Sequence, residues 1–177
     1  FEASNKFNSI ASLVGKPKPS TFVTIQEGCD KFCTFCVVPY TRGKEVSRSQ
    51  NDILSEIKES AKKGVKEIIL LGQNVNSYSF EGISFSSLIY SIAEINEIKR
   101  IRFMTSHPRD MTDELIKAFG TIPKLMPFLH LPVQSGSNRI LKSMNRGHIV
   151  EEYLEIINKL RYVRKDICFS SDFIVGY

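Results

Sequence analysis

Short apolar runs alternate with amphipathic stretches along most of this chain. Most of the runs are continuous rather than alternating, which is typical of a parallel sheet covered by helices. The runs predict strands near residues 21–26, 67–71, 100–105, 128–132 and 168–175. Because strands and helices alternate along the chain, we expect right-handed βαβ units that build a parallel sheet.

The stretches between these runs repeat apolar residues at helical spacing, and we interpret the repeated positions as core-facing. They form the inner faces of three helices: Ile53, Leu54, Ile57 and Ala61, then Leu88, Ile89, Ile92 and Ala93, and finally Tyr153, Ile156, Ile157, Leu160 and Val163.

Helix ends are also visible in the sequence. Ser49 with Asp52 resembles a capping box, and Gly64 predicts where the first helix stops. Two further helices are expected on similar grounds, one from Thr112 to Gly120 and a short one from Ser137 to near Gly147.

This order of elements predicts the fold class and the domain organisation. Five strands are too few to close an eight-stranded barrel, so we expect an α/β fold whose parallel strands form an open, partial (βα) barrel. Residues 1–20 contain no long periodic segment and are rich in proline and lysine at their end, which predicts a linker. Residues 21–177 are expected to form one domain. Because the chain begins with Phe1 and stops within an apolar run, we expect this domain to be truncated at its C-terminal end.

Three cysteines, Cys29, Cys33 and Cys36, follow the first predicted strand at the spacing C-x3-C-x2-C. Three thiolates so close together can hold three irons of a four-iron cluster and leave the fourth iron open. A structural zinc site requires four ligands, and the only other cysteine, Cys168, lies far along the chain, as does the nearest histidine. Zinc and simple buried thiols remain alternatives. An odd cluster of three fits disulfides poorly, and Cys168, in a predicted strand, is expected to be a small buried hydrophobe.

Composition narrows the class of protein. The 177 residues include 42 % hydrophobic residues, enough for a core. The net charge of +5 is compatible with a nucleic-acid partner without requiring one. No run approaches the roughly 18 apolar residues of a membrane span, and the N-terminus has no signal-peptide pattern. Reduced thiols favour the cytoplasm, and no membrane partner is expected.

Polar residues follow the other predicted strands. They occur at 72–78, 105–108, 134–137 and 170–172. Because the carboxyl ends of parallel strands meet at one edge, we expect these residues to share a pocket with the cysteines. The segment with Arg42, Lys44 and Arg48 follows closely and is either a solvated basic stretch or a site for the phosphates of RNA. His107 and His130 are either acid–base or structural residues, and a structural role is favoured.

Phe35 directly precedes the third cysteine, and the spacing C-x3-C-x-aromatic-C resembles the signature of radical S-adenosylmethionine (SAM) enzymes. The resemblance implies that the methionine part of SAM chelates the open iron. One electron then cleaves SAM to a 5′-deoxyadenosyl radical, which takes a hydrogen atom from the substrate. It also implies that Phe35 packs near the adenine of SAM.

Further cofactor contacts are implied by the same resemblance. Gly72, Gln73 and Asn74 occupy the place of a Gly-Gly-Glu-like segment that binds the methionine ammonium, although Gln and Asn here replace the carboxylate. The remaining candidates, for the methionine carboxylate or the ribose hydroxyls, are Gln134, Ser135 and Asp172.

Longer segments from residue 21 onward resemble the radical-SAM methylthiotransferases. They are the residues 29–48, 70–76, 102–108, 129–137 and 171–176. Residues 72–76 and 105–108 are most similar to the MiaB-type branch, which adds a methylthio group to carbon 2 of isopentenyl-adenosine next to the anticodon of tRNA. Other branches modify threonylcarbamoyl-adenosine in tRNA or an aspartate of a ribosomal protein. Outside this chemistry, a non-catalytic, zinc-stabilised RNA-binding module is the competing hypothesis.

Resemblance to this family implies a set of cofactors and partners. They are a [4Fe-4S] cluster with one open iron, SAM, the anticodon loop of tRNA and an electron donor such as a flavodoxin-type reductant. A second cluster is expected in an N-terminal domain with three more cysteines, which serves sulfur supply, and a C-terminal β-domain grips RNA. Because these 177 residues contain neither domain, we expect the chain alone to be incomplete for the full reaction.

Overall fold

The computed structural model describes residues 18–177. Most of the expected linker at 1–20 therefore lies outside the described residues. The five predicted strands are all present, the last three of them shorter than expected: β1 (Ser20–Thr24), β4 (Glu67–Leu71), β7 (Arg100–Phe103), β8 (Phe128–His130) and β9 (Cys168–Ser170). The first three form a parallel sheet in the order β1-β4-β7, and β8 pairs with β9 in parallel.

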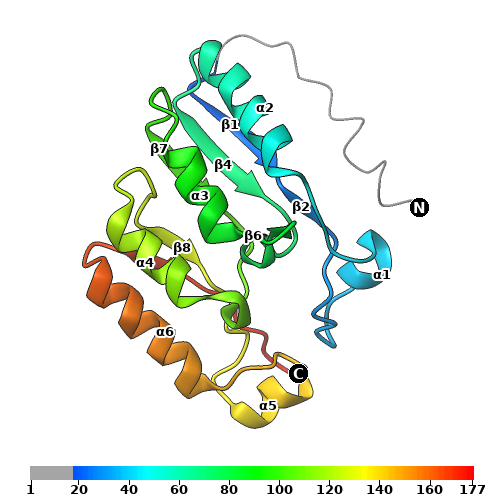
Figure 1. The fold of residues 1–177 in the computed structure, drawn as a ribbon. Helices are drawn as coiled ribbons and strands as arrows, with labels where there is room; N and C mark the ends of the chain where they lie inside the picture. Colours follow the sequence, from blue (N-terminus) through cyan, green and yellow to red (C-terminus); the bar gives the residue numbers. More distant parts are fainter. Residues whose placement is uncertain (1–17) are drawn as a thin grey trace.

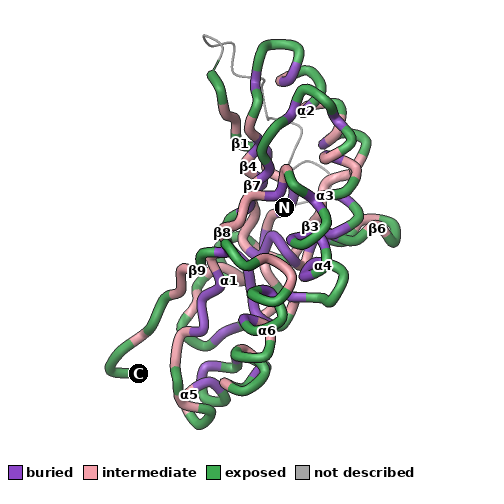
Figure 2. The backbone as a smooth tube through the Cα atoms, turned by 90° about the vertical axis from the view of Figure 1, so that its left-hand side faces the viewer, coloured by how far each residue is buried: buried purple, intermediate pink, exposed green. Residues whose placement is uncertain are grey.

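A parallel bridge between Ile101 and Leu125 joins these two groups of strands. The amide of Ile101 donates to the carbonyl of Lys124 at 2.7 Å, and the amide of Met126 donates to the carbonyl of Ile101 at 3.0 Å. The strands therefore run in the order β1-β4-β7-β8-β9 along one open, curved row, which Figure 2 shows from its edge. This arrangement confirms the expected partial barrel.

Four helices lie on one side of this row of strands (Figure 1). They are α2 (Gln50–Lys62), α3 (Phe85–Ala93), α4 (Asp113–Thr121) and α6 (Val150–Val163). Their apolar stripes form the core together with alternate strand residues such as Val23, Leu70 and Phe103. None of the described helices is long and apolar enough to cross a membrane.

The continuous apolar runs had suggested strands that are buried on both faces. In the structure, only one face of the sheet is buried among the described residues. Phe22, next to the buried Val23, is 64 % exposed. In the part of the chain that the structure describes, the four helices cover one face of the sheet (Figure 1), which buries Val23, and the neighbouring Phe22 points to the opposite, uncovered face. Apolar residues on the two faces of a strand therefore have different surroundings: one set packs in the core, and the other is exposed.

Two of the predicted helix caps form side-chain hydrogen bonds, whereas Ser137 precedes its helix without one. The Ser49 hydroxyl accepts a hydrogen bond from the Asp52 amide at 3.1 Å, and that of Thr112 accepts one from the Leu115 amide at 3.2 Å. Helix α4 continues one residue past Gly120 because this glycine serves packing rather than termination. A Cβ there would lie 3.0 Å from the Cβ of Val163 on α6.

Two expectations about the second half of the chain were wrong. Helix α5 (Asn138–Ser143) ends well before Gly147, because the residues that follow it pack against the cysteine motif instead. Cys168 is exposed rather than buried, since β9 pairs with β8 on one side and lies at the end of the described row of strands.

Several short elements had no counterpart in the sequence pattern. The antiparallel pair β2 (Gln26–Glu27) and β3 (Val46–Ser47) closes the base of residues 28–45, here named the cysteine loop. This loop contains α1 (Val38–Arg42). The remaining short elements are the hairpin β5 (Ser79–Phe80) and β6 (Ile83–Ser84) and the 3-10 turns η2 (Val75–Ser77) and η3 (Pro108–Asp110). Elements of two or three residues are too short to show periodicity.

Candidate active site at the carboxyl ends of the strands

The cysteine loop begins at Gly28, directly after β2. Gly28 has a φ of +82°, and a Cβ at this position would lie 2.6 Å from the carbonyl oxygen of Gly43 and closer still to that of Lys44. The next residue, Cys29, donates its amide hydrogen to the Gly43 carbonyl at 3.2 Å. The two ends of the loop thus touch backbone to backbone, which only glycine permits here.

The three predicted ligands lie within this loop. Cys33 is buried, whereas Cys29 and Cys36 are partly exposed, and the amide of Cys36 donates to the carbonyl of Cys33 at 2.9 Å. Burial raises the pKa of Cys29, and negative charge on Glu45 and on the other two thiols acts in the same direction. The three thiols are therefore electrostatic neighbours.

Among residues 18–177, no group of three His, Cys, Asp or Glu side chains is arranged to share one metal ion. A [4Fe-4S] cluster does not require such convergence, because each thiolate binds a different iron atom. The donor set, three neighbouring thiols on one loop, fits this group.

Residues 143–146, here named the clasp segment, hold the tip of the cysteine loop from more than a hundred residues away. The carbonyl of Met144 accepts from the Thr34 amide at 3.0 Å. Asn145 donates through Nδ2 to the carbonyl of Phe32 at 3.0 Å, and Arg146 donates through Nη1 to Sγ of Cys33 at 3.4 Å. The segment therefore fixes the loop on both sides of its second cysteine.

Gln26 and Gln73 tie the cysteine loop to the end of β4. The Oε1 atom of Gln26 accepts from the Gln73 amide at 2.9 Å and from the Asn74 amide at 3.2 Å. Oε1 of Gln73 in turn accepts from the amide of Gly28 at 2.6 Å. A Cβ on Gly72 would lie 2.6 Å from Oε1 of Gln26, so a side chain there would displace this amide from its hydrogen bonds. Gln73 thus braces the loop.

Asn74 is buried beneath the loop and has one unused acceptor. Its Nδ2 donates to Oδ2 of Asp110 at 2.6 Å, and Oδ1 of the same carboxylate lies 2.6 Å from Nζ of Lys31. Oδ1 of Asn74 has no hydrogen-bond partner in the structure. A buried orphan acceptor is costly, and an ammonium group such as that of methionine would satisfy it.

The last predicted group, Gln134, Ser135 and Asp172, gathers at the ends of β8 and β9. Gln134 has a φ of +73°, and its amide donates to the Asp172 carbonyl at 2.9 Å. The exposed Asp172 carboxylate lies 3.4 Å from Nε2 of His130, whose Nδ1 is 2.8 Å from Oγ of Ser170. Arg146 links this group to the cysteines, because its Nη2 donates to the Pro132 carbonyl at 2.6 Å.

His107 occupies a structural position. Its Nδ1 accepts from the Arg109 amide at 3.1 Å, and its backbone exchanges two hydrogen bonds with the side chain of Asn76. Burial, reinforced by the positive charge of Arg146, lowers the pKa of His107 to about 2. The imidazole is therefore neutral at physiological pH and does not serve as an acid there.

The basic residues that follow the cysteines separate into two kinds. Arg42 is 60 % exposed beside Glu27, and Lys44 is exposed. Arg48 is 10 % exposed, and its Nη1 donates to Oε2 of Glu56 at 2.7 Å and to the Thr24 carbonyl at 2.8 Å. This geometry makes Arg48 a brace between β1 and α2, which argues against a direct contact with phosphate. Phe35 is exposed at the surface of the loop.

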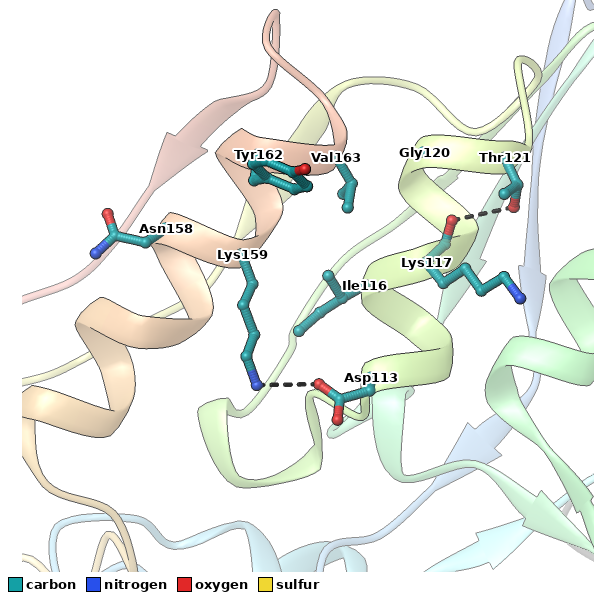
Figure 3. Close-up of a pocket in the computed structure, with 9 residues that line it drawn as sticks. All are labelled: Asp113, Ile116, Lys117, Gly120, Thr121, Asn158, Lys159, Tyr162 and Val163. Atoms are coloured by element: carbon teal, nitrogen blue, oxygen red, sulfur yellow. Dashed lines mark hydrogen bonds and ion pairs between the residues drawn. The ribbon is translucent and has the colours of Figure 1, made fainter.

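Two cavities among the described residues bear on the site. One, of about 450 Å³, lies beside the cysteine loop and is lined by Lys31, Glu45, Ser77 and Asp110, among others. Burial raises the pKa of Glu45, although a hydrogen bond from Ser77 at 2.6 Å opposes this. Figure 3 shows the other, a groove of about 610 Å³ between α4 and α6. Its lining residues belong to neither the cysteine loop nor the strand ends.

Sequence reasoning missed Gln26, Lys31, Asp110, Asn145 and Arg146. None of them belongs to a recognisable sequence motif. Only Arg146 offered a signal, as an arginine next to Gly147 in a loop that follows a helix, and this is weak.

Comparison with known families settles the class of protein. Residues 23–177 match the family model of the Radical SAM superfamily. The chain belongs to the radical SAM superfamily. This confirms the resemblance seen around the three cysteines. Membership implies a [4Fe-4S] cluster and SAM as cofactors, and the neighbouring thiols and the orphan acceptor of Asn74 fit both groups.

Two relatives from bacteria carry the same name, tRNA-2-methylthio-N(6)-dimethylallyladenosine synthase. The protein of Buchnera aphidicola subsp. Cinara cedri is 59 % identical over 168 residues, which are 92 % of this chain and 39 % of that protein. The protein of Rickettsia akari is 54 % identical over 182 residues, covering 100 % of this chain and 41 % of that protein. The chain thus spans about two-fifths of the length of these radical SAM relatives.

Solved structures agree with the fold. The cobalamin-dependent radical SAM enzyme OxsB, with aqua-cobalamin and S-adenosylmethionine bound, has a TM-score of 0.69 at 19 % identity and covers 86 % of this chain and 23 % of that chain. The radical SAM methyltransferase TsrM from Kitasatospora setae has a TM-score of 0.68 at 15 % identity, covering 86 % and 30 %. At such identities the similarity extends to the fold alone.

Proposed function

We propose that this chain is the catalytic core of a cytoplasmic tRNA methylthiotransferase. Its substrate would be isopentenyl-adenosine next to the anticodon, and the added methylthio group would go to carbon 2 of the adenine. The observation that carries this proposal is the identity of 54–59 % to the two relatives named above, which extends over nearly the whole chain. The arrangement of the strand ends supports it, because three thiols and the polar groups that follow each strand meet at one edge.

In this proposal each strand end has a distinct task. The thiolates of Cys29, Cys33 and Cys36 hold the cluster. Together, the cluster and SAM supply a one-electron cleavage that yields a radical able to remove a hydrogen atom from the substrate. Oδ1 of Asn74 accepts from the methionine ammonium, while Gly72 and Gln73 keep the loop in place. The ribose hydroxyls or the methionine carboxylate are left to Gln134, Ser135 and Asp172, and Phe35 packs near the adenine.

The chain alone does not contain everything that the reaction requires. We infer a second cluster for sulfur supply outside these residues, and an electron donor such as a flavodoxin-type protein. Both follow from the resemblance to methylthiotransferases, whose length this chain covers only in part.

The decisive experiment compares products. Full-length protein, reconstituted anaerobically and reduced, is incubated with SAM and tRNA that carries isopentenyl-adenosine, and the nucleosides are analysed by mass spectrometry. We expect the methylthio product from the full-length protein. The 177-residue chain is expected to cleave SAM slowly without forming this product. Product only from threonylcarbamoyl-adenosine tRNA, or only from a ribosomal protein, would assign the chain to another branch, and bound zinc without iron would favour the non-catalytic module.

Binding of tRNA provides a separate prediction. If Arg42 and Lys44 contact phosphates next to the target base, Arg42→Ala and Lys44→Ala in the full-length protein should each reduce the slope of log affinity against log salt by about one unit. Single-stranded bases of an anticodon loop can be splayed out and read by proteins. The matched control is Arg48→Ala, which removes an equal charge from an internal ion pair with Glu56 and should leave the slope unchanged.

Measurement of tRNA affinity at several salt concentrations checks both halves of this prediction. Unchanged slopes for Arg42→Ala and Lys44→Ala would mean that these residues form only a solvated surface. A reduced slope for Arg48→Ala would instead support the hypothesis from the sequence that Arg48 also contacts RNA phosphates.

A further inference from the structure

Arg146 is a buried cation that reaches one of the cluster cysteines. It is only 5 % exposed. Its Nη1 donates to Sγ of Cys33 at 3.4 Å, its Nη2 donates to the Pro132 carbonyl at 2.6 Å, and its Nε has no partner. Arginine keeps its charge throughout the physiological pH range, so a full positive charge lies next to this thiol.

In the described part of the chain, no carboxylate forms an ion pair with this charge. Within residues 18–177, none of the ion pairs includes Arg146. Its close electrostatic neighbours are His107 and His148, and burial lowers the pKa of both. A histidine ring is neutral or positive, so neither can supply a compensating negative charge. A buried charge without a counter-ion is strongly unfavourable. Of the two groups in the described residues to which the Arg146 side chain donates, the Pro132 carbonyl and the Cys33 thiol, only the thiol can become an anion.

We propose that Arg146 is the counter-charge of the cluster and, acting through Cys33, raises its reduction potential. This inference rests on the proposed radical SAM chemistry and names a positioning residue for it. Reduction adds one electron, taken from an external donor, to the cluster. A fixed positive charge against one of its sulfurs stabilises the more negative, reduced state. Hydrogen bonds to the cysteine sulfurs are among the factors that set the potentials of iron–sulfur clusters.

The test must distinguish the effect of the Arg146 charge from the effect of its hydrogen bonds, which help to hold the cysteine loop. Asn145, its neighbour, donates hydrogen bonds to the carbonyls of Lys31 and Phe32 but carries no charge. Asn145→Ala therefore weakens the clasp without altering the electrostatics, and it is the matched control. Arg146→Gln and Arg146→Met remove the charge, and glutamine retains a donor for the Pro132 carbonyl. Arg146→Lys keeps the charge but loses the planar fork.

The experiment is a redox titration of the reconstituted full-length protein with dithionite, followed by electron paramagnetic resonance. A variant with all three loop cysteines replaced by alanine identifies which signal belongs to this site. We expect the one-electron reduction equilibrium of Arg146→Gln and Arg146→Met to shift at least about tenfold toward the oxidised state, which is about 59 mV. Asn145→Ala should keep the wild-type potential, and Arg146→Lys, which keeps the charge, should stay closer to wild type than the neutral variants.

The variants distinguish an effect of Arg146 on the reduction potential from a purely structural role. Folded neutral variants with wild-type iron content and an unchanged potential would overturn the proposal, and Arg146 would then be only a brace. Neutral variants that fold by circular dichroism but lose iron, while Asn145→Ala keeps it, would support it. If neither neutral variant folds, Arg146→Lys decides: a potential near the wild-type value supports the proposal because the charge is kept, whereas a fall of about 59 mV or more with wild-type iron content would overturn it. A wild-type protein that holds no cluster at this loop would count against the proposed function instead.

Discussion

Replacing Cys29, Cys33 or Cys36 by alanine is expected to abolish the four-iron cluster of this chain. Each thiolate binds a different iron atom, so no neighbouring ligand can substitute for one that is lost. The effect should be close to complete for each of the three positions. Iron and sulfide analysis after anaerobic reconstitution, together with the absorption spectrum, measures it directly.

Cys168→Ala is the matched control for these three substitutions. Cys168 is exposed in β9, and its thiol donates a long hydrogen bond to the carbonyl of Asp166 at 3.8 Å. Removing this thiol should leave both the fold and the iron content unchanged. Loss of iron in the Cys168 variant, or retention of a full cluster in any loop variant, would contradict the assignment of ligands. Zinc bound in place of iron in the wild-type protein would favour the structural-zinc alternative.

The larger elements of the fold could be predicted because they are long enough to show a period. Helix α2 contains thirteen residues with a clear apolar stripe and a serine cap. The pair β2 and β3, with two residues in each strand, leaves no such trace, and yet it closes the cysteine loop. The uncovered face of the sheet could not be recognised either, because a run such as Phe22-Val23 is apolar on both faces whether helices cover it or not.

The cysteines of the site were visible in the sequence, whereas their supports were not. The motif is local, so its spacing alone points to its chemistry. Arg146 and Asn145 contact the loop across more than a hundred residues, and only the fold brings them there. Arg48 illustrates the opposite error. A basic residue near a candidate RNA surface suggests a phosphate contact, but its partner Glu56 lies on the following helix, out of reach of a motif search.

The conformation of Gly28 leads to the second large effect that we expect. Its φ of +82° is unfavourable for any residue with a Cβ, at a cost of about 1–2 kcal/mol. A Cβ would also press against the carbonyls of Gly43 and Lys44, which belong to the backbone and cannot rotate away. Overpacking of this kind costs about a further 1–3 kcal/mol. The loop would have to open at its base, where Gln73 and Gln26 hydrogen-bond to Gly28.

Gly82 offers an unusually close control, because its φ is also +82° and no atom lies within 4 Å of a Cβ built there. Gly82→Ala should therefore show the backbone cost alone, about 1–2 kcal/mol in the free energy of unfolding, with normal iron content. Gly28→Ala should lose more stability and also lose most of its iron, since the three cysteines would no longer be held together. Urea unfolding and iron analysis of both variants test this. Equal losses of stability with full iron in both would show that the contact between Gly28 and the end of the loop does not hold the cysteines in place.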